Sequence, residues 1–329
     1  MSEKTHKRIL PKVLITGANG FIGGALMRHY RAQGIAVVGV DLVTNGVDII
    51  EGDVGKPHTF AQLLEDCDVV IHTAAIVSNA ISDADMWNIN VRATGNLVAA
   101  AVKYRVERFV HISSIVAYGN AAVGELDETH PVHADGGSYV LTKLASEHAV
   151  LAATAKSDMQ AVIIRPGDVY GPGSRPWVTL PLEAITKGQF MLPARGQGLF
   201  RPIYIDDLIR GIGLAVSTPE AAGEIINLSC SGYITTHDFF SHHFKWLGKR
   251  GPLTVPTRVA LLAAAAASKI ADLTGGVNEA STATVLQLST QSWFSIAKAQ
   301  TILGWAPEIA FDEGMRRSHM WAKEQGLVK

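Results

Sequence analysis

The sequence predicts an α/β fold built on a doubly wound parallel sheet, with a smaller, mostly helical lobe in the second half of the chain. Short β-branched runs alternate with longer helical patterns up to Arg165, which is typical of βαβ units whose helices cover both faces of a sheet. Beyond that point Pro166, Pro172, Pro176 and Pro181 interrupt the chain, and the alternation stops. The 329 residues are enough for one large core or two fused ones.

Strands are expected where Val and Ile cluster, and helices where apolar residues recur every three or four positions. The expected strands are residues 12–16, 36–41, 48–51, 69–72, 109–113 and 161–165, with 201–205 and 224–228 returning to the sheet later in the chain. The expected helices of the first half are residues 21–33, 87–104 and 138–155.

Composition excludes several classes of protein. Charged residues make up 18% of the chain and the formal net charge is -1, so no overall field attracts nucleic acid or an anionic membrane. Cys67 and Cys230 are expected to be buried, unpaired residues of a protein in a reducing compartment. Pro11 and Lys12 interrupt the apolar stretch near the start, no targeting signal is recognisable, and we expect a cytoplasmic protein.

The longest apolar run, residues 259–267, is too short to span a membrane. We expect a buried or surface-lying helix there, whose hydrophobic patch could contact a lipid or a partner chain.

Gly17, Gly20 and Gly23 follow the first strand and open the first helix. A pyrophosphate can sit on a helix N-terminus where no Cβ atom blocks the backbone, and the N–H groups and the helix dipole then hold its charge. Asp41 closes the second strand, where a carboxylate can accept hydrogen bonds from adenosine ribose hydroxyls. No Lys or Arg follows it before Lys56, so the segment predicts a Rossmann-type site that favours NAD over NADP.

Tyr139 and Lys143 lie one turn apart on a predicted helix and share a face. A free phenol has a pKa of about 10, so tyrosine acts as a base near neutrality only if a cation stabilises its phenolate. Ser114 follows the predicted strand 109–113, at the sheet edge where ligands bind. We therefore expect Tyr139 as general base on a substrate hydroxyl, Ser114 as a hydrogen-bond partner of the same oxygen, and Lys143 as the group that lowers the pKa of the tyrosine.

These motifs together resemble the extended short-chain dehydrogenase/reductase superfamily of the NAD-dependent epimerase/dehydratase type, over nearly the whole chain. The resemblance rests on residues 17–23, Asp41, 52–54, 72–75, Asn90, Ser113 with Ser114, Tyr139 with Lys143, 165–172, Asp206 with Asp207, and 294–307. We expect an NAD-binding Rossmann domain made of residues 1–170 and roughly 201–232, and a substrate-binding lobe made of residues 171–200 and 233–329.

The resemblance also implies the contacts of the cofactor. Asp53 and Val54 would contact the adenine ring, Ala74 would line the cofactor cleft, Lys143 would also bind the nicotinamide ribose, and Val169 would pack beside the nicotinamide. The other residues expected at the cofactor, beside the three glycines and Asp41, are Asn19, Phe21, Ile22, Ala75, Asn90, Ser113, Tyr139 and Pro166.

The superfamily contains dehydrogenases, reductases, and sugar-nucleotide epimerases and dehydratases, so the fold does not select a reaction. In the sugar-nucleotide branch an arginine ahead of the paired acids binds the diphosphate. Counting back from Asp207, Phe200 holds that position and Arg201 follows it. One residue along a strand reverses the face, which disfavours a sugar nucleotide unless a local bulge restores Arg201. A sugar-nucleotide epimerase or dehydratase with bound NAD therefore stays the alternative to an alcohol dehydrogenase or ketone reductase.

The second half is similar to the 3β-hydroxysteroid and sterol dehydrogenase branch at residues 252–256, 259–270 and 286–298. This resemblance implies a fairly apolar secondary alcohol or ketone, such as a steroid-like or aryl molecule. Apolar side chains that could line its pocket, or could instead pack between the lobes, are Trp177, Phe190, Met191, Leu192, Leu199 and Phe200. The expected substrate contacts are Val77, Tyr118, Asp168, Trp177, Phe200 and Arg201, although Asp168 could equally cap a turn.

No metal is expected. His237, His242 and His243 have no matching carboxylate or cysteine pattern and are expected to be solvated helix residues. The expected partners are a small-molecule substrate and a second copy of the chain, because many relatives dimerise through the helices that correspond to residues 87–104 and 138–155.

Overall fold

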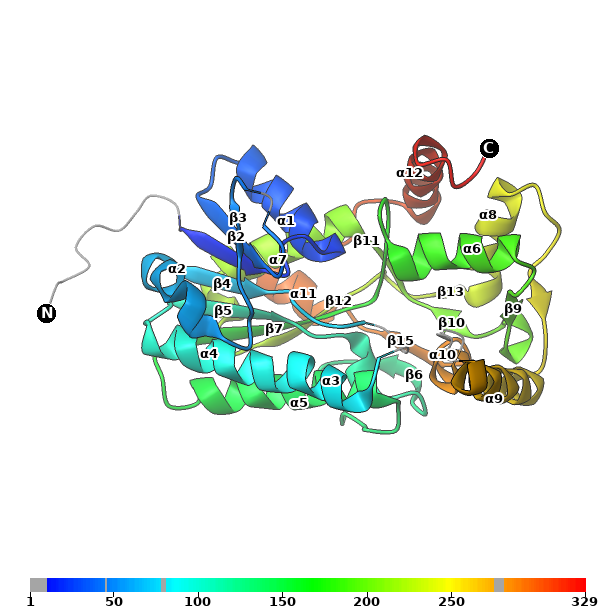
Figure 1. Ribbon diagram of the computed structural model, residues 1–329, viewed down its shortest axis with the longest axis horizontal. Coiled ribbons are helices and arrows are strands. Elements are labelled where there is room, and N and C mark those ends of the chain that lie inside the picture. Colours follow the sequence, from blue (N-terminus) through cyan, green and yellow to red (C-terminus); the bar gives the residue numbers. More distant parts are fainter. Residues whose placement is uncertain (1–10, 45, 78–80, 275–280) are drawn as a thin grey trace, which may run out of the picture.

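The computed structural model describes residues 11–44, 46–77, 81–274 and 281–329. Residues 1–10, which include most of the segment searched for a targeting signal, lie outside the described residues. Figure 1 shows a sheet covered by helices on the left and a smaller lobe of helices and short strands on the right. The predicted fold class is confirmed.

Within the described residues, seven parallel strands form the central sheet in the order β12-β7-β5-β4-β1-β2-β3. They are β1 (Val13–Thr16), β2 (Val37–Asp41), β3 (Ile49–Glu51), β4 (Val69–His72), β5 (Arg108–Ile112), β7 (Gln160–Pro166) and β12 (Ile225–Leu228). The chain runs from β1 outward to β3 and then returns to β4 on the other side of β1. The carboxyl ends of β1 and β4 therefore border the topological switch point, where open α/β sheets bind ligands.

One predicted strand does not join this sheet. Instead of a sheet strand over 201–205, β11 (Pro202–Tyr204) pairs with β8 (Asp168–Tyr170) in a separate parallel pair. Ile205 already begins a helix, and β12 takes the edge position beside β7. Arg201 separates two short strands that have different partners. β10 (Leu199–Phe200) pairs with β13 (Ile234–Thr235), whereas β11 pairs with β8.

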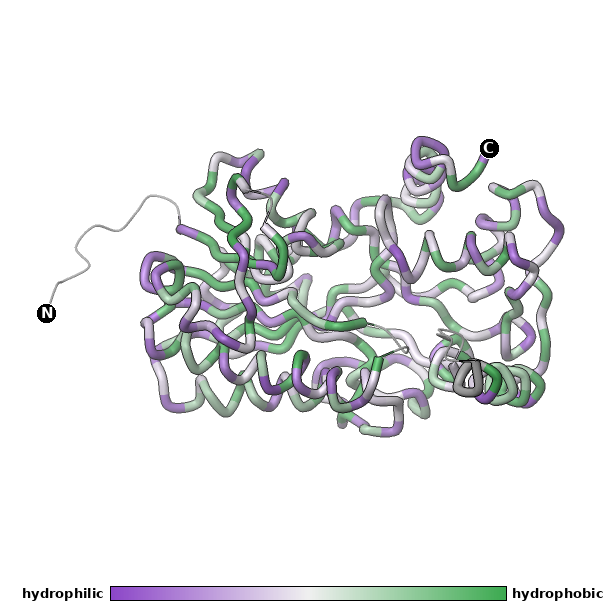
Figure 2. Tube along the Cα trace, viewed as in Figure 1, coloured by the Kyte–Doolittle hydropathy of each residue, from purple (hydrophilic) through white to green (hydrophobic). Residues whose placement is uncertain are grey.

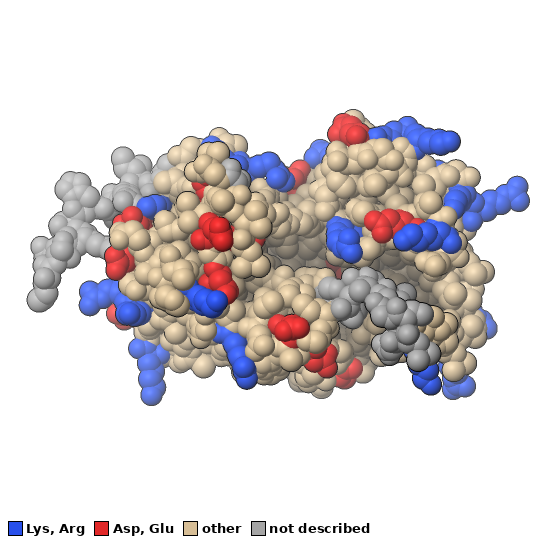
Figure 3. Space-filling view, viewed as in Figure 1, with Lys and Arg blue, Asp and Glu red and all other residues tan. Residues whose placement is uncertain are grey.

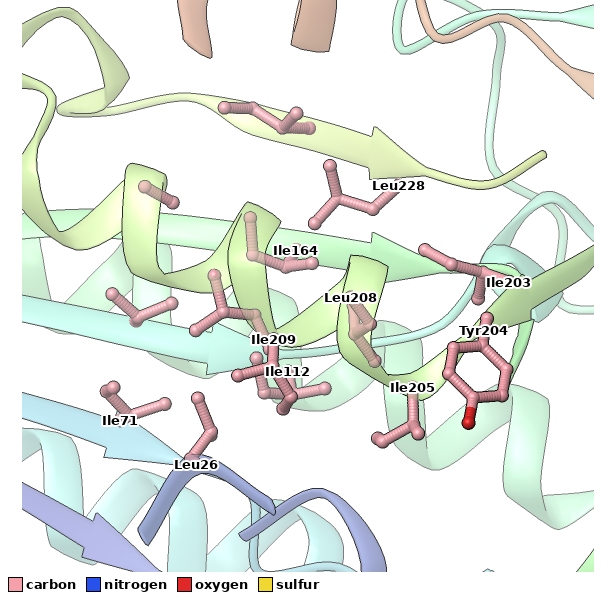
Figure 4. Close-up of a cluster of buried hydrophobic side chains, with 14 of the residues drawn as sticks. Leu26, Ile71, Ile112, Ile164, Ile203, Tyr204, Ile205, Leu208, Ile209 and Leu228 are labelled. Atoms are coloured by element: carbon pink, nitrogen blue, oxygen red, sulfur yellow. The ribbon is translucent and has the colours of Figure 1, made fainter. Parts of the chain in front are cut away.

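Neighbouring residues of each central strand face opposite cores, as the period of a strand requires. Val13 and Ile15 of β1 pack toward α1 (Phe21–Ala32) and α7 (Ile205–Ser217), whereas Leu14 packs toward the other face. That other face is covered by α2 (Ala61–Asp66), α4 (Thr94–Lys103) and α5 (Ser138–Thr154). Figure 4 shows side chains of α1 and α7 meeting Ile71, Ile112 and Ile164 of the sheet, and Figure 2 shows hydrophobic residues along the central strands.

The predicted helix over 87–104 begins earlier and is not uniform. It consists of α3 (Asp83–Trp87), a π-helical turn (Asn88–Ala93) and α4. The π turn carries Asn90, whose side-chain amide donates to the Ile76 carbonyl and to Thr142 and accepts from the Ile76 N–H. The irregular turn thus places a polar side chain between the sheet edge and α5, a common use of such turns near functional sites.

The smaller lobe combines helices with short strand pairs. It contains α6 (Leu180–Thr186), α8 (Thr236–Trp246), α9 (Thr257–Thr274), α10 (Thr282–Gln287), α12 (Phe311–Glu324), β9 (Met191–Leu192) and β14 (Leu253–Thr254). Part of the chain predicted for this lobe packs on the sheet domain. β15 (Gln291–Phe294) pairs with β6 (Val123–Leu126), and α11 (Ala297–Leu303) and the buried Trp305 pack against β12 and α7. The exact domain boundaries stay a prediction.

Candidate active site

The glycine turn after β1 is shaped by close backbone contacts. Gly17 has φ +69°, and a Cβ there would lie 2.8 Å from the Ala74 Cα. A Cβ on Gly23 would lie 2.1 Å from the Gly17 carbonyl oxygen, so α1 can approach the turn only without that side chain. Gly20 begins α1 and carries no side chain that could cap its N–H groups. These free N–H groups face the switch point and suit a pyrophosphate.

Asp41 lies at the end of β2 beside this turn. Its carboxylate accepts hydrogen bonds from the Asn19 and Leu42 N–H groups, each at 2.8 Å, and the Asn19 amide donates to the Val43 carbonyl at 2.6 Å. Asp53 accepts from the Gly55 N–H at 2.8 Å and lies 3.7 Å from the exposed Lys56 ammonium. The structure therefore places the residues expected at a pyrophosphate and an adenosine along one edge of the sheet, and these residues fit a dinucleotide.

The three expected catalytic residues come together at the end of β5. Ser114 caps the short 3-10 turn Ile115–Tyr118, and its hydroxyl hydrogen-bonds to the Tyr139 phenol. Tyr139 and Lys143 lie on α5, with the Lys143 Nζ 5.9 Å from the centre of the Tyr139 ring. The ammonium donates to the Ile112 carbonyl at 2.8 Å, which ties the helix to the last residue of β5.

Burial shifts the pKa values of both Tyr139 and Lys143. Burial raises the pKa of Tyr139 to about 12, and the hydrogen bond from Ser114 lowers it only in part. Burial also lowers the pKa of Lys143 to about 8, against the opposing attraction of Glu147. Desolvation of the phenol therefore outweighs the hydrogen bond from Ser114 and favours the protonated form of Tyr139.

Helix α5 rests on the sheet through polar side chains. Thr142, Lys143, Ser146 and Glu147 are buried on its inward face. The Ser146 hydroxyl hydrogen-bonds to His111 at 2.9 Å, and the carboxylate of Glu147 accepts from the guanidinium of Arg165 at 2.9 and 2.7 Å. The hydroxyl of Ser113 also donates to Glu147. These contacts fix the height and rotation of the helix that carries the catalytic pair.

A second buried contact links the glycine turn to this helix. His72 bonds to the Thr16 and Thr94 hydroxyls at 2.7 and 2.8 Å and stacks on His111 with ring centres 5.5 Å apart. Burial lowers the pKa of His72 to about 3 and the pKa of His111 well below its usual value, so both rings are neutral. His111, Glu147 and Ser146 were not predicted at the site. The sequence signal for these residues is that they are polar and interrupt otherwise apolar strand and helix patterns.

A small cavity lies beside Tyr139. It has a volume of about 30 Å³ and is lined by Val116, Asn120, Gly137, Tyr139, Val140, Ala283 and Gln287. Figure 3 shows a hollow between the sheet domain and the smaller lobe. Gln287 of α10 was not predicted at the site. It reaches the cavity from the lobe and also hydrogen-bonds to the carboxylate of Asp168.

The expected substrate residues are not equally accessible. Val77 is 57% exposed, whereas Tyr118 is buried under the Arg165 guanidinium and donates to the Asn227 amide oxygen at 2.9 Å. Phe200 and the half-buried Trp177 belong to an aromatic cluster, with ring centres 4.8 Å apart. Phe190, Phe239 and Phe240 also belong to that cluster.

Asp168 and Arg201 form a buried pair. The Arg201 Nε lies 3.4 Å from the Asp168 carboxylate, and the same carboxylate accepts from the Arg201 N–H. The guanidinium also donates to the Leu199 carbonyl and the Thr290 hydroxyl. Burial raises the pKa of Asp168, and Arg201 opposes that rise. Asp168 therefore pairs with the buried Arg201 rather than only capping a turn.

Two expectations about single residues need correction. His243 was expected to be solvated but is fully buried, and its Nε2 donates to the Trp177 carbonyl at 2.8 Å because α8 packs over the segment before α6. Cys67 is buried as expected, but Cys230 is only partly buried. Among the described residues no helix is long and apolar enough to cross a membrane, and no group of His, Cys, Asp and Glu could hold a metal ion.

The comparison with family models decides the classification. Residues 13–229 match the model of the NAD dependent epimerase/dehydratase family. The chain belongs to this family. The resemblance to extended short-chain dehydrogenases/reductases is thereby confirmed, and the chain is an enzyme of an NAD-dependent family.

Its relatives differ in activity. The chain is 28% identical to the decarboxylating sterol-4-alpha-carboxylate 3-dehydrogenase erg26 of Schizosaccharomyces pombe, over 94% of this chain and 96% of that protein. It is 26% identical to the 2-alkyl-3-oxoalkanoate reductase of Stenotrophomonas maltophilia, over 93% and 98% of the two chains. It is 30% identical to the UDP-glucose 4-epimerase of Vibrio cholerae, over 70% and 75%. Among solved structures, MoeE5 in complex with UDP-glucose and NAD has a TM-score of 0.77 at 25% identity, over 95% and 99%.

The glycine turn gives a direct test of cofactor binding. The change Gly23→Ala should abolish detectable NAD binding, because its Cβ would lie 2.1 Å from the Gly17 carbonyl oxygen. The change Gly24→Ala is the matched control, since its Cβ would lie 3.5 Å from the nearest atom, the Ala18 carbonyl oxygen. Isothermal titration with NAD measures both. Equal affinity of the two variants would contradict the assignment of the turn.

The depressed pKa of Lys143 predicts a pH profile. Below its pKa of about 8 the ammonium is charged and can stabilise the phenolate that Tyr139 becomes after giving up its proton. Above that pH the charge is lost, so kcat should fall for a reaction in which Tyr139 gives up its proton. A kcat measured from about pH 6 to about pH 10 checks this, and a value that stays constant across the range would count against the role of Lys143.

Proposed function

We propose that this chain is an NAD-dependent oxidoreductase that interconverts a secondary alcohol and a ketone on a fairly apolar small molecule. The proposal rests on where Phe200 and Arg201 lie and on what they contact. Phe200 lies in the aromatic cluster, and Arg201 is 3% exposed and bonded to Asp168. Neither residue offers a cation to the diphosphate of a sugar nucleotide, and a buried dianion without a partner is unfavourable.

The names of two relatives support an apolar substrate. The sterol-4-alpha-carboxylate dehydrogenase and the 2-alkyl-3-oxoalkanoate reductase both act on molecules with large hydrocarbon parts. The aromatic cluster of the lobe, with Trp177 at its partly exposed side, suits such a molecule. Which alcohol or ketone binds is a question for a substrate screen.

Tyr139 transfers the proton and Ser114 orients the substrate. In the reduction direction the protonated phenol of Tyr139 donates to the carbonyl oxygen, and the Ser114 hydroxyl hydrogen-bonds to the same oxygen. Lys143, which is anchored to the Ile112 carbonyl, stabilises the resulting phenolate. When bound, NAD exchanges a hydride with the substrate carbon. The raised pKa of Tyr139 suits the reduction direction, because the unliganded site already holds the proton to be donated.

The proposal also covers the cofactor and the cellular location. The Asp41 carboxylate would repel a 2′-phosphate, so we propose NAD rather than NADP as the cofactor. We also propose that the enzyme is cytoplasmic.

We further propose a homodimer through α4 and α5, where Leu141 and Leu151 of α5 are 40% and 37% exposed. Light scattering coupled to size exclusion should give twice the mass of one chain. A monomer at micromolar concentration would reject the dimer.

A sugar-nucleotide epimerase is the second candidate, favoured by the match to the UDP-glucose 4-epimerase. Such an enzyme uses the same Tyr, Lys and Ser and returns the hydride to its substrate. A screen of steroid-like and aryl secondary alcohols beside UDP-sugars separates the two. NADH absorbance should accumulate with an apolar alcohol. Interconversion of a UDP-sugar without net NADH would establish the alternative instead.

The catalytic role of Tyr139 is tested by removing one oxygen atom. The change Tyr139→Phe should lower kcat by about 10²- to 10⁴-fold, because the proton donor is lost, and should leave the Kd for NAD nearly unchanged. The matched control is Tyr104→Phe at the end of α4. Steady-state kinetics and NAD titration measure both properties. A Tyr139→Phe variant with wild-type kcat would show that the assignment is wrong.

A further inference from the structure

Helix α9 presents three of its larger apolar residues to solvent, while Leu261 is partly buried. It packs chiefly on α10, and its inward side carries the small residues Ala260 and Ala264, which are buried. Val259, Leu262 and Ile270 are 48%, 74% and 62% exposed. An ordinary surface helix turns its large apolar side chains toward the core, so α9 has the opposite arrangement.

The exposed apolar residues form one continuous stripe. From Val259 the spacing to Leu262, Ala263, Ala266 and Ile270 is three, four, seven and eleven residues, which places them on one face of a helix. All of these residues are exposed. We call this set of residues the α9 stripe. Leu253 in the segment before the helix is 61% exposed and adds to the apolar surface.

Basic residues border the α9 stripe. Arg258 and Lys269 are exposed and lie three turns apart along one edge of it. Residues 251–270 contain no Asp or Glu, and Asp272 is the next acidic residue along the chain. Figure 3 shows basic side chains along the lower right edge of the molecule, where Figure 1 draws α9. The surface is locally cationic although the whole chain has a net charge of -1.

We propose that the α9 stripe docks on the surface of a lipid bilayer that contains anionic lipids. Apolar side chains on one face with Lys and Arg at its border are the pattern of helices that lie in a membrane interface, where the cations meet lipid phosphates. A second copy of the chain fits less well. A two-fold contact along the stripe would bring Arg258 and Lys269 of both copies into the same interface.

The docked face adjoins the candidate active site through α10. This helix packs against α9 and supplies Ala283 and Gln287 to the cavity beside Tyr139. Docking would therefore bring the mouth of the cavity close to the acyl region, from which an apolar substrate could enter without crossing water. Docking depends only on the α9 stripe and its charged border, so it can be tested independently of the proposed oxidoreductase activity.

Vesicle flotation tests the proposal with the full chain. The protein should float with vesicles of phosphatidylcholine mixed with phosphatidylglycerol and much less with vesicles of phosphatidylcholine alone. The change Leu262→Glu should lower the bound fraction at least tenfold. The change Val123→Glu is the matched control, because Val123 is also 74% exposed but lies on β6 of the sheet domain, and it should bind like the unmodified chain.

The charged border is tested separately. The double change Arg258→Glu with Lys269→Glu should remove the preference for anionic vesicles. Thermal melting by circular dichroism verifies that each variant is folded, and light scattering reports its mass. No flotation of the unmodified chain, or equal flotation of the Leu262→Glu and Val123→Glu variants, would overturn the proposal. A lower mass on Leu262→Glu without a change in flotation would identify a second copy as the occupant and overturn it as well.

Discussion

The buried polar face of α5 is the constraint on which the candidate site depends. Tyr139 and Lys143 have fixed positions because the same helix is bonded to β5 and β7 through Ser146 and Glu147. A slide or rotation of α5 would leave the carboxylate of Glu147 and the guanidinium of Arg165 buried without each other, which costs several kcal/mol. A helix held on the sheet by apolar contacts alone would tolerate small shifts in position. A ladder of buried hydrogen bonds specifies one arrangement.

The same burial controls the proton chemistry. Desolvation raises the pKa of Tyr139 and lowers the pKa of Lys143. The site is therefore loaded with a proton before substrate binds, and the lysine charge becomes useful when a phenolate forms. The neutral stacked rings of His72 and His111 extend the polar contacts to Thr16, immediately before the glycine turn. The cofactor turn and the catalytic helix thus belong to one hydrogen-bonded body.

Sequence patterns predicted those parts of the site that depend on local order. Gly17 lies between β1 and α1, Gly23 lies in the first turn of α1, and Tyr139 and Lys143 lie one turn apart on α5. Spacing alone therefore placed each pair correctly. The partnership of Glu147 with Arg165 could not be predicted, because it joins a helix to a strand across the sheet edge. Spacing also gave no measure of desolvation, which raises the pKa of Tyr139. The strand expected over 201–205 failed for a similar reason, since the neighbour available to it depends on the tertiary fold.

A crystal structure with NAD bound tests the central claim most directly. The account predicts that the Tyr139 phenol oxygen and the Ser114 hydroxyl both lie about 3 Å from one position beside the nicotinamide ring where a substrate oxygen can sit. It also predicts that α5 keeps its bonds to His111 and Arg165. A phenol turned away from the ring, or a dinucleotide bound elsewhere than at the turn after β1, would contradict the account.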